Sequence, residues 1–208
     1  MSALDNVALP ESLDCLRSRS ALAGGKPSIQ DGSDMDAAPN RIAVSYGDIC
    51  ELQVDAIVNP AHAELLGGGG LDGIIHDRAG PELLAACQAL GGCVVGQAKT
   101  TSAFRLSAGW VIHTVGPVWR GGGEGEDVLL ASCYRASLNE AVRVGARTVA
   151  FPGISTGLHR FPSDRAARIA VREVIKFLAG SRHPDHVTFV CFDNQSWRTY
   201  TNLIGEMS

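Results

Sequence analysis

The sequence predicts a three-layer α/β sandwich, in which helices cover both faces of a mixed, largely parallel sheet. After residue 40, short runs rich in Val, Ile, Thr and aromatic residues alternate with longer helical segments. In segment 163–179 the apolar residues fall close to one face and the basic residues on the other, as a helix that lies on a sheet requires. Two glycine-rich stretches stand where a strand ends and a helix begins, and α/β folds bind ligands at that edge of the sheet.

The expected elements follow from local composition along the chain. Residues 1–40 form an N-terminal extension and linker, because 23–40 is dense in Gly, Ser, Asp and Pro, and 41–208 form the domain. Within the extension, 9–22 either form a short helix that docks on the domain or stay mobile. The expected strands are 42–46, 56–59, 98–104, 110–115, 148–152 and 187–192. The expected helices are 70–78, 81–90, 127–144, 163–179 and 196–204.

Composition and charge exclude several classes of protein. The chain has 208 residues, 45% of them hydrophobic and 19% charged, which is enough for a core without disulfide or metal staples. Its net charge of -4 gives no general attraction to nucleic acid or to an anionic membrane. The six cysteines include no C-x-x-C pair, and no run approaches the roughly 18 apolar residues of a membrane span. We therefore expect a cytoplasmic protein with reduced thiols and no membrane contact.

The two glycine-rich stretches predict a diphosphate ligand. At glycines 67–70, backbone N–H groups can approach a phosphate without a Cβ in the way, and the next helix turns its positive end to the same place. A floppy surface turn is the alternative, but the apolar helix that follows at once favours a phosphate loop. In the second stretch, 151–162, Ser155, Thr156 and Gly157 offer further donors, and Ser163 or Asp164 can cap the next helix.

The sequence does not fit two other nucleotide-binding motifs. Gly68, Gly70 and Gly73 satisfy G-x-G-x-x-G, but a dinucleotide-binding fold then needs an acidic residue about 20 positions on, near Cys93. No glycine run is followed by Lys-Ser or Lys-Thr, which excludes a P-loop. A helix starting at residue 70 instead presents a carboxylate and an imidazole four residues apart, at 72 and 76, on one face. Such a pair is either structural or able to position water and move protons beside the diphosphate.

A series of motifs in order then points to a family. They are GDI at 47–49, VDAIVN at 54–59, GGGGLDGIIH at 67–76, GP at 80–81, GQAK at 96–99, VIHTVGP at 111–117 and FPGISTG at 151–157. Together they resemble the macrodomain family, and within it the MacroD-type ADP-ribosylhydrolases. The resemblance covers about residues 41–200 and implies an α/β/α macrodomain that binds ADP-ribose, here as a monomer without a cofactor. Zinc-dependent macrodomains carry cysteine and histidine ligands around the first glycine loop, which has no cysteine here, so we expect no metal.

The resemblance also implies roles for particular residues. In the family, the aspartate of GDI accepts a hydrogen bond from the adenine amino group, which assigns Asp48, with Ile49 beside it. An aromatic residue after the last strand packs on adenine, and Phe192 matches it. The diphosphate and the distal ribose would contact the end of the second strand and both glycine loops, at Asn59, Gly68, Gly69, Gly70, Leu71, Gly153, Ile154, Ser155, Thr156, Gly157, Leu158 and His159.

The implied activity is the hydrolytic removal of mono-ADP-ribose from a modified molecule. Acceptors open to such enzymes are Asp or Glu esters of proteins, O-acetyl-ADP-ribose, and bases or ends of nucleic acid, so the partners are ADP-ribosylated proteins or DNA. The catalytic candidates are Asp72, which would place water and stabilise developing charge, His76, which would support it, and His62. A non-catalytic ADP-ribose reader is the alternative, and within the sequence only Asp72 and His76 separate the two.

Two short segments depart from the family pattern. The family has Asn-Ala-Ala-Asn after the second strand, whereas this chain has Asn-Pro-Ala-His at 59–62, so an imidazole replaces an amide beside the distal ribose. That imidazole, His62, can titrate near neutral pH and is an alternative base. The usual Tyr-Gly of the second loop is His159-Arg160, which removes an aromatic gate and adds a cation, and so hints at a different or more anionic substrate.

Overall fold

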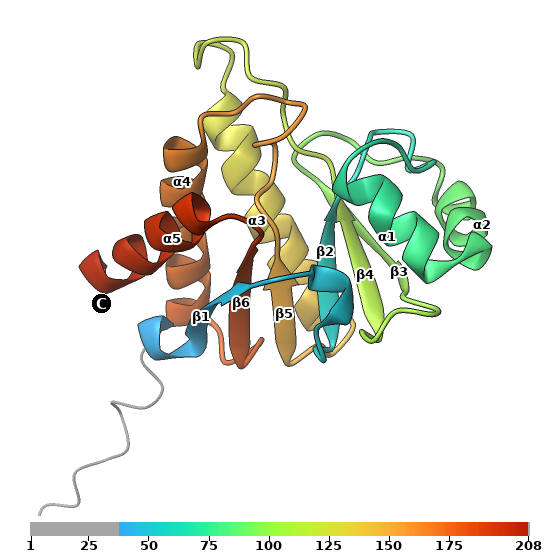
Figure 1. The fold of residues 1–208 in the computed structure, drawn as a ribbon, viewed down its shortest axis with the longest axis horizontal. Coiled ribbons are helices and arrows are strands. Elements are labelled where there is room, and N and C mark those ends of the chain that lie inside the picture. Colours follow the sequence, from blue (N-terminus) through green and yellow to red (C-terminus); the bar gives the residue numbers. More distant parts are fainter. Residues whose placement is uncertain (1–37, 208) are drawn as a thin grey trace, which may run out of the picture. The chain divides into compact units, whose positions relative to one another are not determined.

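A six-stranded sheet forms the centre of the molecule, and helices cover both of its faces (Figure 1). The structure is a computed structural model that describes residues 38–207. The strand order is β1-β6-β5-β2-β4-β3, and all neighbouring strands run parallel except β3 and β4, which are antiparallel at one edge. The mixed, largely parallel sandwich predicted from the sequence is confirmed.

The elements lie close to their predicted positions. The strands are β1 (Ile42–Tyr46), β2 (Ala56–Pro60), β3 (Ala98–Ser102), β4 (Trp110–Thr114), β5 (Thr148–Phe151) and β6 (His186–Cys191). The helices are α1 (Leu71–Ala79), α2 (Pro81–Leu90), α3 (Glu126–Arg143), α4 (Ser163–Gly180) and α5 (Asn194–Glu206), with short 3-10 turns η1 (Ala38–Arg41) and η2 (Ile49–Glu51). The strand predicted for 98–104 ends early, because the backbone turns into the left-handed region at Phe104, with φ 55°. The helix suggested for 9–22 lies outside the described residues, and the division at residue 40 stays a prediction.

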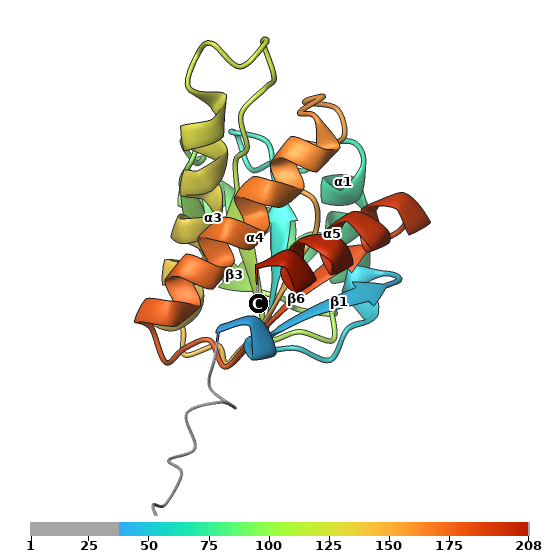
Figure 2. The same ribbon diagram turned by 90° about the vertical axis from the view of Figure 1, so that its left-hand side faces the viewer.

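Alternating side chains of the strands divide the core into two layers. In β2, Ala56 and Val58 face the cluster formed with α3, α4 and α5, whereas Ile57 faces the cluster formed with α1 and α2. Figure 2 shows α3 and α4 on one side of the sheet and α1 on the other. Because both faces are covered, the sheet is accessible to a ligand chiefly at the ends of its strands.

Two helix starts differ from expectation. α5 begins two residues earlier than predicted, because the side chain of Asp193 accepts a hydrogen bond from the backbone N–H of Ser196 at 2.7 Å and caps it. The expected cap of α4 by Ser163 or Asp164 is wrong. Pro162 occupies the N-cap position without a side-chain bond, and Ser163 is already the first helical residue.

The described residues also bear on the expected state of the cysteines and on membrane-spanning helices. The five cysteines among them are free and buried. No helix in residues 38–207 is long and apolar enough to cross a membrane.

Candidate active site

The cleft of the molecule lies where β1, β2, β5 and β6 end, the edge that the glycine-rich stretches predict. It consists of three adjoining pockets, and Phe192, 71% exposed, lines all three. The apolar arm is lined chiefly by Asp48, Ile49, Ile74, Pro152 and Phe192. The central arm is lined chiefly by His62, Asp72, Ser155, Gly157, Leu158 and His159, and the polar arm by Thr156, Ser163, Asp164, Asp193, Gln195 and Thr199.

Asp72 is the buried charged group of the central arm. It lies in the first turn of α1 and is 2% exposed. Its Oδ1 accepts from Nδ2 of Asn59 at 2.7 Å, and its Oδ2 lies 3.0 Å from Nδ1 of His62. An ionised carboxylate only accepts, so Nδ1 of His62 carries the proton and Nε2 keeps a free lone pair. Asp72 and His62 therefore form an acid-base pair that opens into the cleft.

His76 faces the same carboxylate from the next turn of α1. Its Nε2 lies 3.6 Å from Oδ1 of Asp72 and has no hydrogen-bond partner among the described residues. The four-residue spacing thus brings Asp72 and His76 together as predicted, but at a distance just beyond a hydrogen bond. A movement of several tenths of an ångström would bring Nε2 of His76 within hydrogen-bond distance of Asp72.

The first glycine loop folds tightly around these groups. A Cβ on Gly68 would stand 2.5 Å from the imidazole of His62, and one on Gly73 would stand 2.4 Å from the carbonyl oxygen of Gly68. Gly70 has φ 66°, which few other residues adopt, and is the N-cap of α1. Gly68 therefore lies beneath His62, while Gly69, Gly70 and Leu71 line the cleft.

The second loop is held in a strained form. Ser155 is buried with φ 65°, and its hydroxyl has no hydrogen-bond partner within the described part of the chain. Leu158 reaches across the cleft, with its Cδ1 3.7 Å from where a Cβ of Gly69 would stand. Gly157 borders open space on the cleft side, whereas the Ile154 side chain is fully buried in the core. The two loops thus meet over the central arm.

The apolar arm contains the residues predicted to read adenine. Ile49 is buried, and Phe192 stands exposed opposite it. Oδ1 of Asp48 accepts from the backbone N–H of Cys50 at 2.9 Å, and its Oδ2 accepts from Arg78 at 2.9 Å. The turn-capping role that the Gly-Asp pair also suggests is therefore present, and Arg78 is a neighbour that sequence reasoning missed.

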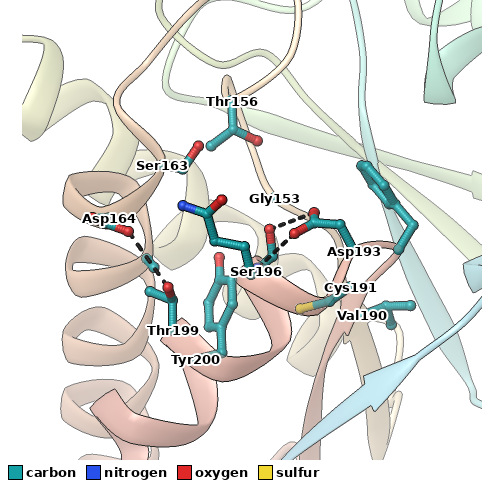
Figure 3. A pocket seen from close by; sticks show the side chains of 13 residues that line it. Gly153, Thr156, Ser163, Asp164, Val190, Cys191, Asp193, Ser196, Thr199 and Tyr200 are labelled. Atoms are coloured by element: carbon teal, nitrogen blue, oxygen red, sulfur yellow. Dashed lines mark hydrogen bonds between the residues drawn. The ribbon is translucent and has the colours of Figure 1, made fainter.

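The polar arm lies between the first turns of α4 and α5 (Figure 3). Thr199 donates to Asp164 at 3.5 Å, and Asp193 accepts from the hydroxyl of Ser196 at 2.7 Å. The Ser196 backbone and hydroxyl bonds lower the pKa of Asp193, which keeps it ionised. Two carboxyl groups make this arm unsuited to a phosphate.

The two departures from the family pattern lie side by side. The rings of His62 and His159 meet edge to face, with centroids 6.4 Å apart and planes at 86°. The backbone carbonyl of His159 also accepts from the N–H of Trp119 at 2.9 Å, which ties this loop to the segment before α3. A single substitution at either histidine therefore alters the surroundings of the other.

Behind Asp72, a buried set of side chains was not foreseen from the sequence. Asn59 is fully buried and its Nδ2 lies 3.1 Å from Nδ1 of His113, in addition to its bond to Asp72. Nε2 of His113 lies 2.9 Å from Oγ1 of Thr101 and 3.6 Å from Sγ of Cys87. The predicted contact of Asn59 with a ligand stays a prediction, since here the amide faces the carboxylate.

Fold and cleft define the class of α/β proteins that bind ligands at the carboxyl edge of the sheet, and sequence comparison gives the family. The model of the Macro domain matches residues 58–170. The chain is 49% identical over 179 residues to a macro domain-containing protein of Methanosarcina mazei, covering 86% of this chain and 96% of that protein. It is 52% identical over 171 residues to an O-acetyl-ADP-ribose deacetylase of Citrobacter koseri, covering 80% and 97%. This chain therefore belongs to the macro domain family.

Solved structures of macrodomains are similar to this chain in fold and in sequence. The Oceanobacillus iheyensis macrodomain with MES bound has a TM-score of 0.75 and 37% identity, over 79% of this chain and 90% of that one. The Trypanosoma brucei macrodomain in complex with ADP-ribose has a TM-score of 0.75 and 40% identity, over 80% of this chain and 70% of that one. The resemblance to the macrodomain family that the motifs indicated is confirmed.

Proposed function

We propose that this chain binds ADP-ribose in the cleft and hydrolyses the bond between its distal ribose and an attached group, with ADP-ribose esters as the main substrates. The observation that carries the proposal is the buried carboxylate of Asp72, held by Asn59 and His62 between two glycine-rich loops. The relative named as an O-acetyl-ADP-ribose deacetylase and the macrodomain solved with ADP-ribose support both the ligand and the reaction class.

The apolar arm and the central arm suit different parts of ADP-ribose. Adenine fits the apolar arm, with its amino group toward Asp48 and its face on Phe192. The diphosphate fits between the two glycine loops, where the hydroxyl of Ser155, which has no partner among the described residues, is available to donate to it. The distal ribose then reaches the central arm beside Asp72. The acceptor side is bordered by His159, next to the cation of Arg160.

The chemistry proposed for Asp72 and His62 is base-assisted attack by water. Asp72 holds the proton on Nδ1 of His62, so the free Nε2 can take a proton from water. The oxygen of that water forms a bond to the anomeric carbon of the distal ribose, and the bond from this carbon to the acceptor oxygen breaks, with its electron pair leaving on that oxygen. In O-acetyl-ADP-ribose the water attacks the acyl carbon instead, and the acyl C–O bond breaks with its electron pair leaving on the ribose oxygen. The proton on His62 then neutralises the leaving group. The negative charge of Asp72 stabilises the imidazolium and the positive charge that develops on the ribose.

An assay of released ADP-ribose on substrates that differ only in linkage tests this proposal. The panel comprises O-acetyl-ADP-ribose, a Glu ester, Arg and Ser glycosides, a phosphate end and a thymidine base. We expect release from the esters. A protein that binds ADP-ribose in calorimetry but releases it from no member of the panel would be a reader, and the proposed hydrolysis would be wrong.

Variants then separate the roles of the central residues. Asp72→Ala is expected to lose about 100-fold or more of the rate at saturating substrate while still binding ADP-ribose, and His76→Ala less. His62→Asn restores the family's amide and serves as the matched control for the base. If His62→Asn keeps the full rate, the carboxylate alone activates water. If Asp72→Ala keeps it, the proposed mechanism is wrong.

A further inference from the structure

We infer that His113, which does not line the cleft, is a positioning residue that fixes the carboxylate of Asp72 through the amide of Asn59. The inference rests on the proposed function, because it assigns the amide link a role in the rate of that reaction. The strand register makes the link possible. Asn59 of β2 and His113 of β4 are paired opposite each other in the parallel ladder, and Asp72 follows on α1.

The amide of Asn59 has only one workable orientation. Its Nδ2 has two protons and two acceptors, Oδ1 of Asp72 at 2.7 Å and Nδ1 of His113 at 3.1 Å. Its Oδ1 has no hydrogen-bond partner among the described residues. A flipped amide would set that oxygen against the carboxylate of Asp72 and lose both bonds. The carboxylate of Asp72 therefore selects this orientation, and Nδ1 of His113 stabilises it by accepting the second Nδ2 proton.

The imidazole of His113 is itself held in one form. Since Nδ1 accepts from Asn59, the ring proton is on Nε2, which donates to Oγ1 of Thr101 at 2.9 Å. Burial, and secondarily the neighbouring His76, lower the pKa of His113 to about 4, so the ring is neutral at pH 7. A chain of bonds thus runs from β3 through β4 and β2 to the catalytic carboxylate.

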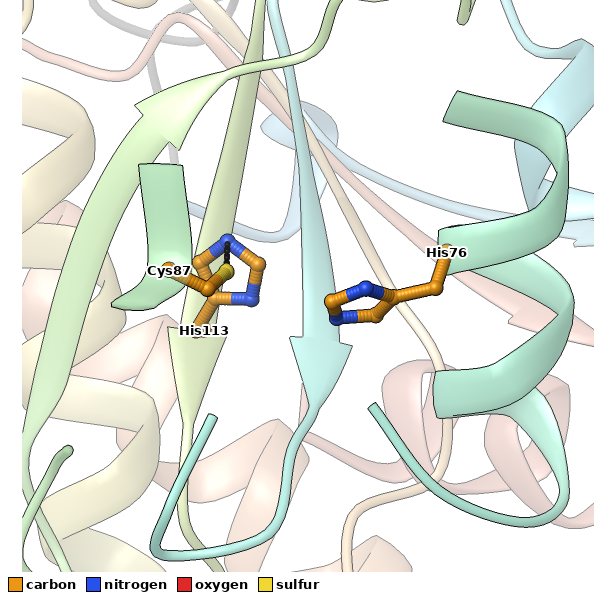
Figure 4. A group of neighbouring side chains, drawn as sticks. All are labelled: His76, Cys87 and His113. Atoms are coloured by element: carbon orange, nitrogen blue, oxygen red, sulfur yellow. Dashed lines mark hydrogen bonds between the residues drawn. The ribbon is translucent and has the colours of Figure 1, made fainter. Parts of the chain in front are cut away.

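Figure 4 shows His113 beside Cys87, with His76 on the other side of β2. Candidate ligand atoms of these three side chains lie within 4.8 Å of one another, a spacing that also suits a metal ion. The ring nitrogen of His113 nearest Cys87 is the one that donates to Thr101, and burial raises the pKa of the Cys87 thiol to about 11. A protonated nitrogen and a protonated thiol favour a hydrogen-bonded link over a metal site.

Three substitutions at one position test this link. In His113→Asn, Oδ1 takes the place of Nδ1 and can still accept from Asn59. His113→Leu has nearly the same shape but no acceptor, and His113→Gln keeps a polar end toward Thr101 but not toward Asn59. We expect the Asn variant to stay within about 3-fold of the wild-type rate at saturating substrate, and the Leu and Gln variants to lose about 10- to 100-fold with little change in ADP-ribose affinity.

Val111→Ala, in the core of the same strand, controls for simple destabilisation. It is expected to lower Tm like the His113 variants without lowering the saturated rate. The inference would be overturned if the saturated rate followed Tm across the three His113 variants and Val111→Ala. Equal rates for His113→Asn and His113→Leu would also overturn it.

A second readout does not depend on catalysis. The side-chain amide protons of Asn59, followed by NMR, should exchange with solvent faster in His113→Leu than in His113→Asn. Equal exchange in the two variants would also overturn the inference. An inactive wild type, or an active Asp72→Ala, would instead count against the proposed function, and the exchange experiment would still decide whether His113 orders the amide.

Discussion

Replacing Gly157 by glutamate is expected to abolish most ADP-ribose binding without unfolding the protein. Gly157 lines the central arm, and its backbone does not need a left-handed φ. Among the described residues, its two chain neighbours aside, no heavy atom lies within 4 Å of the position where its Cβ would stand. The new side chain therefore has room to extend into the cleft, where the diphosphate is proposed to lie.

The magnitude follows from charge. A carboxylate about 5 Å from a phosphate charge, at an effective dielectric constant of about 20, costs on the order of 3 kcal/mol. Salt screens part of this repulsion at an exposed loop, so we expect roughly a 100-fold loss of affinity that becomes smaller at high ionic strength.

Calorimetry with ADP-ribose measures the loss, and Gly157→Gln, with the same shape and no charge, gives the purely steric part. Melting curves of both variants should match that of the wild type. If the Glu and Gln variants bind ADP-ribose as tightly as the wild type does, the diphosphate does not lie at this loop.

Three further substitutions address other parts of the domain. Asp48→Ala should weaken ADP-ribose binding by about 1 to 3 kcal/mol with little change in the rate at saturating substrate. The Tm of this variant must be measured as well, because Asp48 also bonds to Cys50 and Arg78. A large loss of rate with intact affinity would show that Asp48 does not have the proposed role. Glu126→Gln should lower Tm at pH 7, because hydrogen bonds from its own and nearby backbone N–H groups lower the pKa of Glu126 from 4.5 to about 2. That stabilisation is fully present well above pH 4.5 and is lost as the pH falls through 4.5 toward 2, so a gap in Tm that stays constant over this range would contradict it. Arg41 donates to five backbone carbonyls between residues 178 and 185, and Arg41→Lys should cost about 1 to 3 kcal/mol in urea unfolding, with an unchanged midpoint as the contrary result.

Local pattern was enough to predict the layers and both loops. The continuous apolar run of β2 is typical of a strand buried on both faces, and the glycines at 67–70 mark the sharp entry to α1. A second purpose of Gly68, clearance for the imidazole of His62, depends on a fold-level contact that composition does not reveal.

The remaining features arise from pairings across long stretches of chain. His113 stands 54 residues from Asn59, and only the register of β2 against β4 brings the two together. Arg78 meets Asp48 only once α1 has packed beside the η2 turn that follows β1. The start of α4 was misjudged because Ser163 is a good cap in isolation, but the preceding proline takes that position.

The left-handed backbone of Ser155 has a consequence for how stability and affinity trade against each other. Such a conformation in a residue other than glycine costs on the order of 1 to 3 kcal/mol, and a buried hydroxyl without a partner among residues 38–207 adds to it. Both penalties reduce the free energy of unfolding. The loop therefore already has its binding conformation in the free protein, and a ligand needs to reorganise it little. Selection for a more stable fold would remove this serine, whereas selection for a tighter grip on a phosphate would retain it. One residue of a surface loop thus sets two selective pressures against each other.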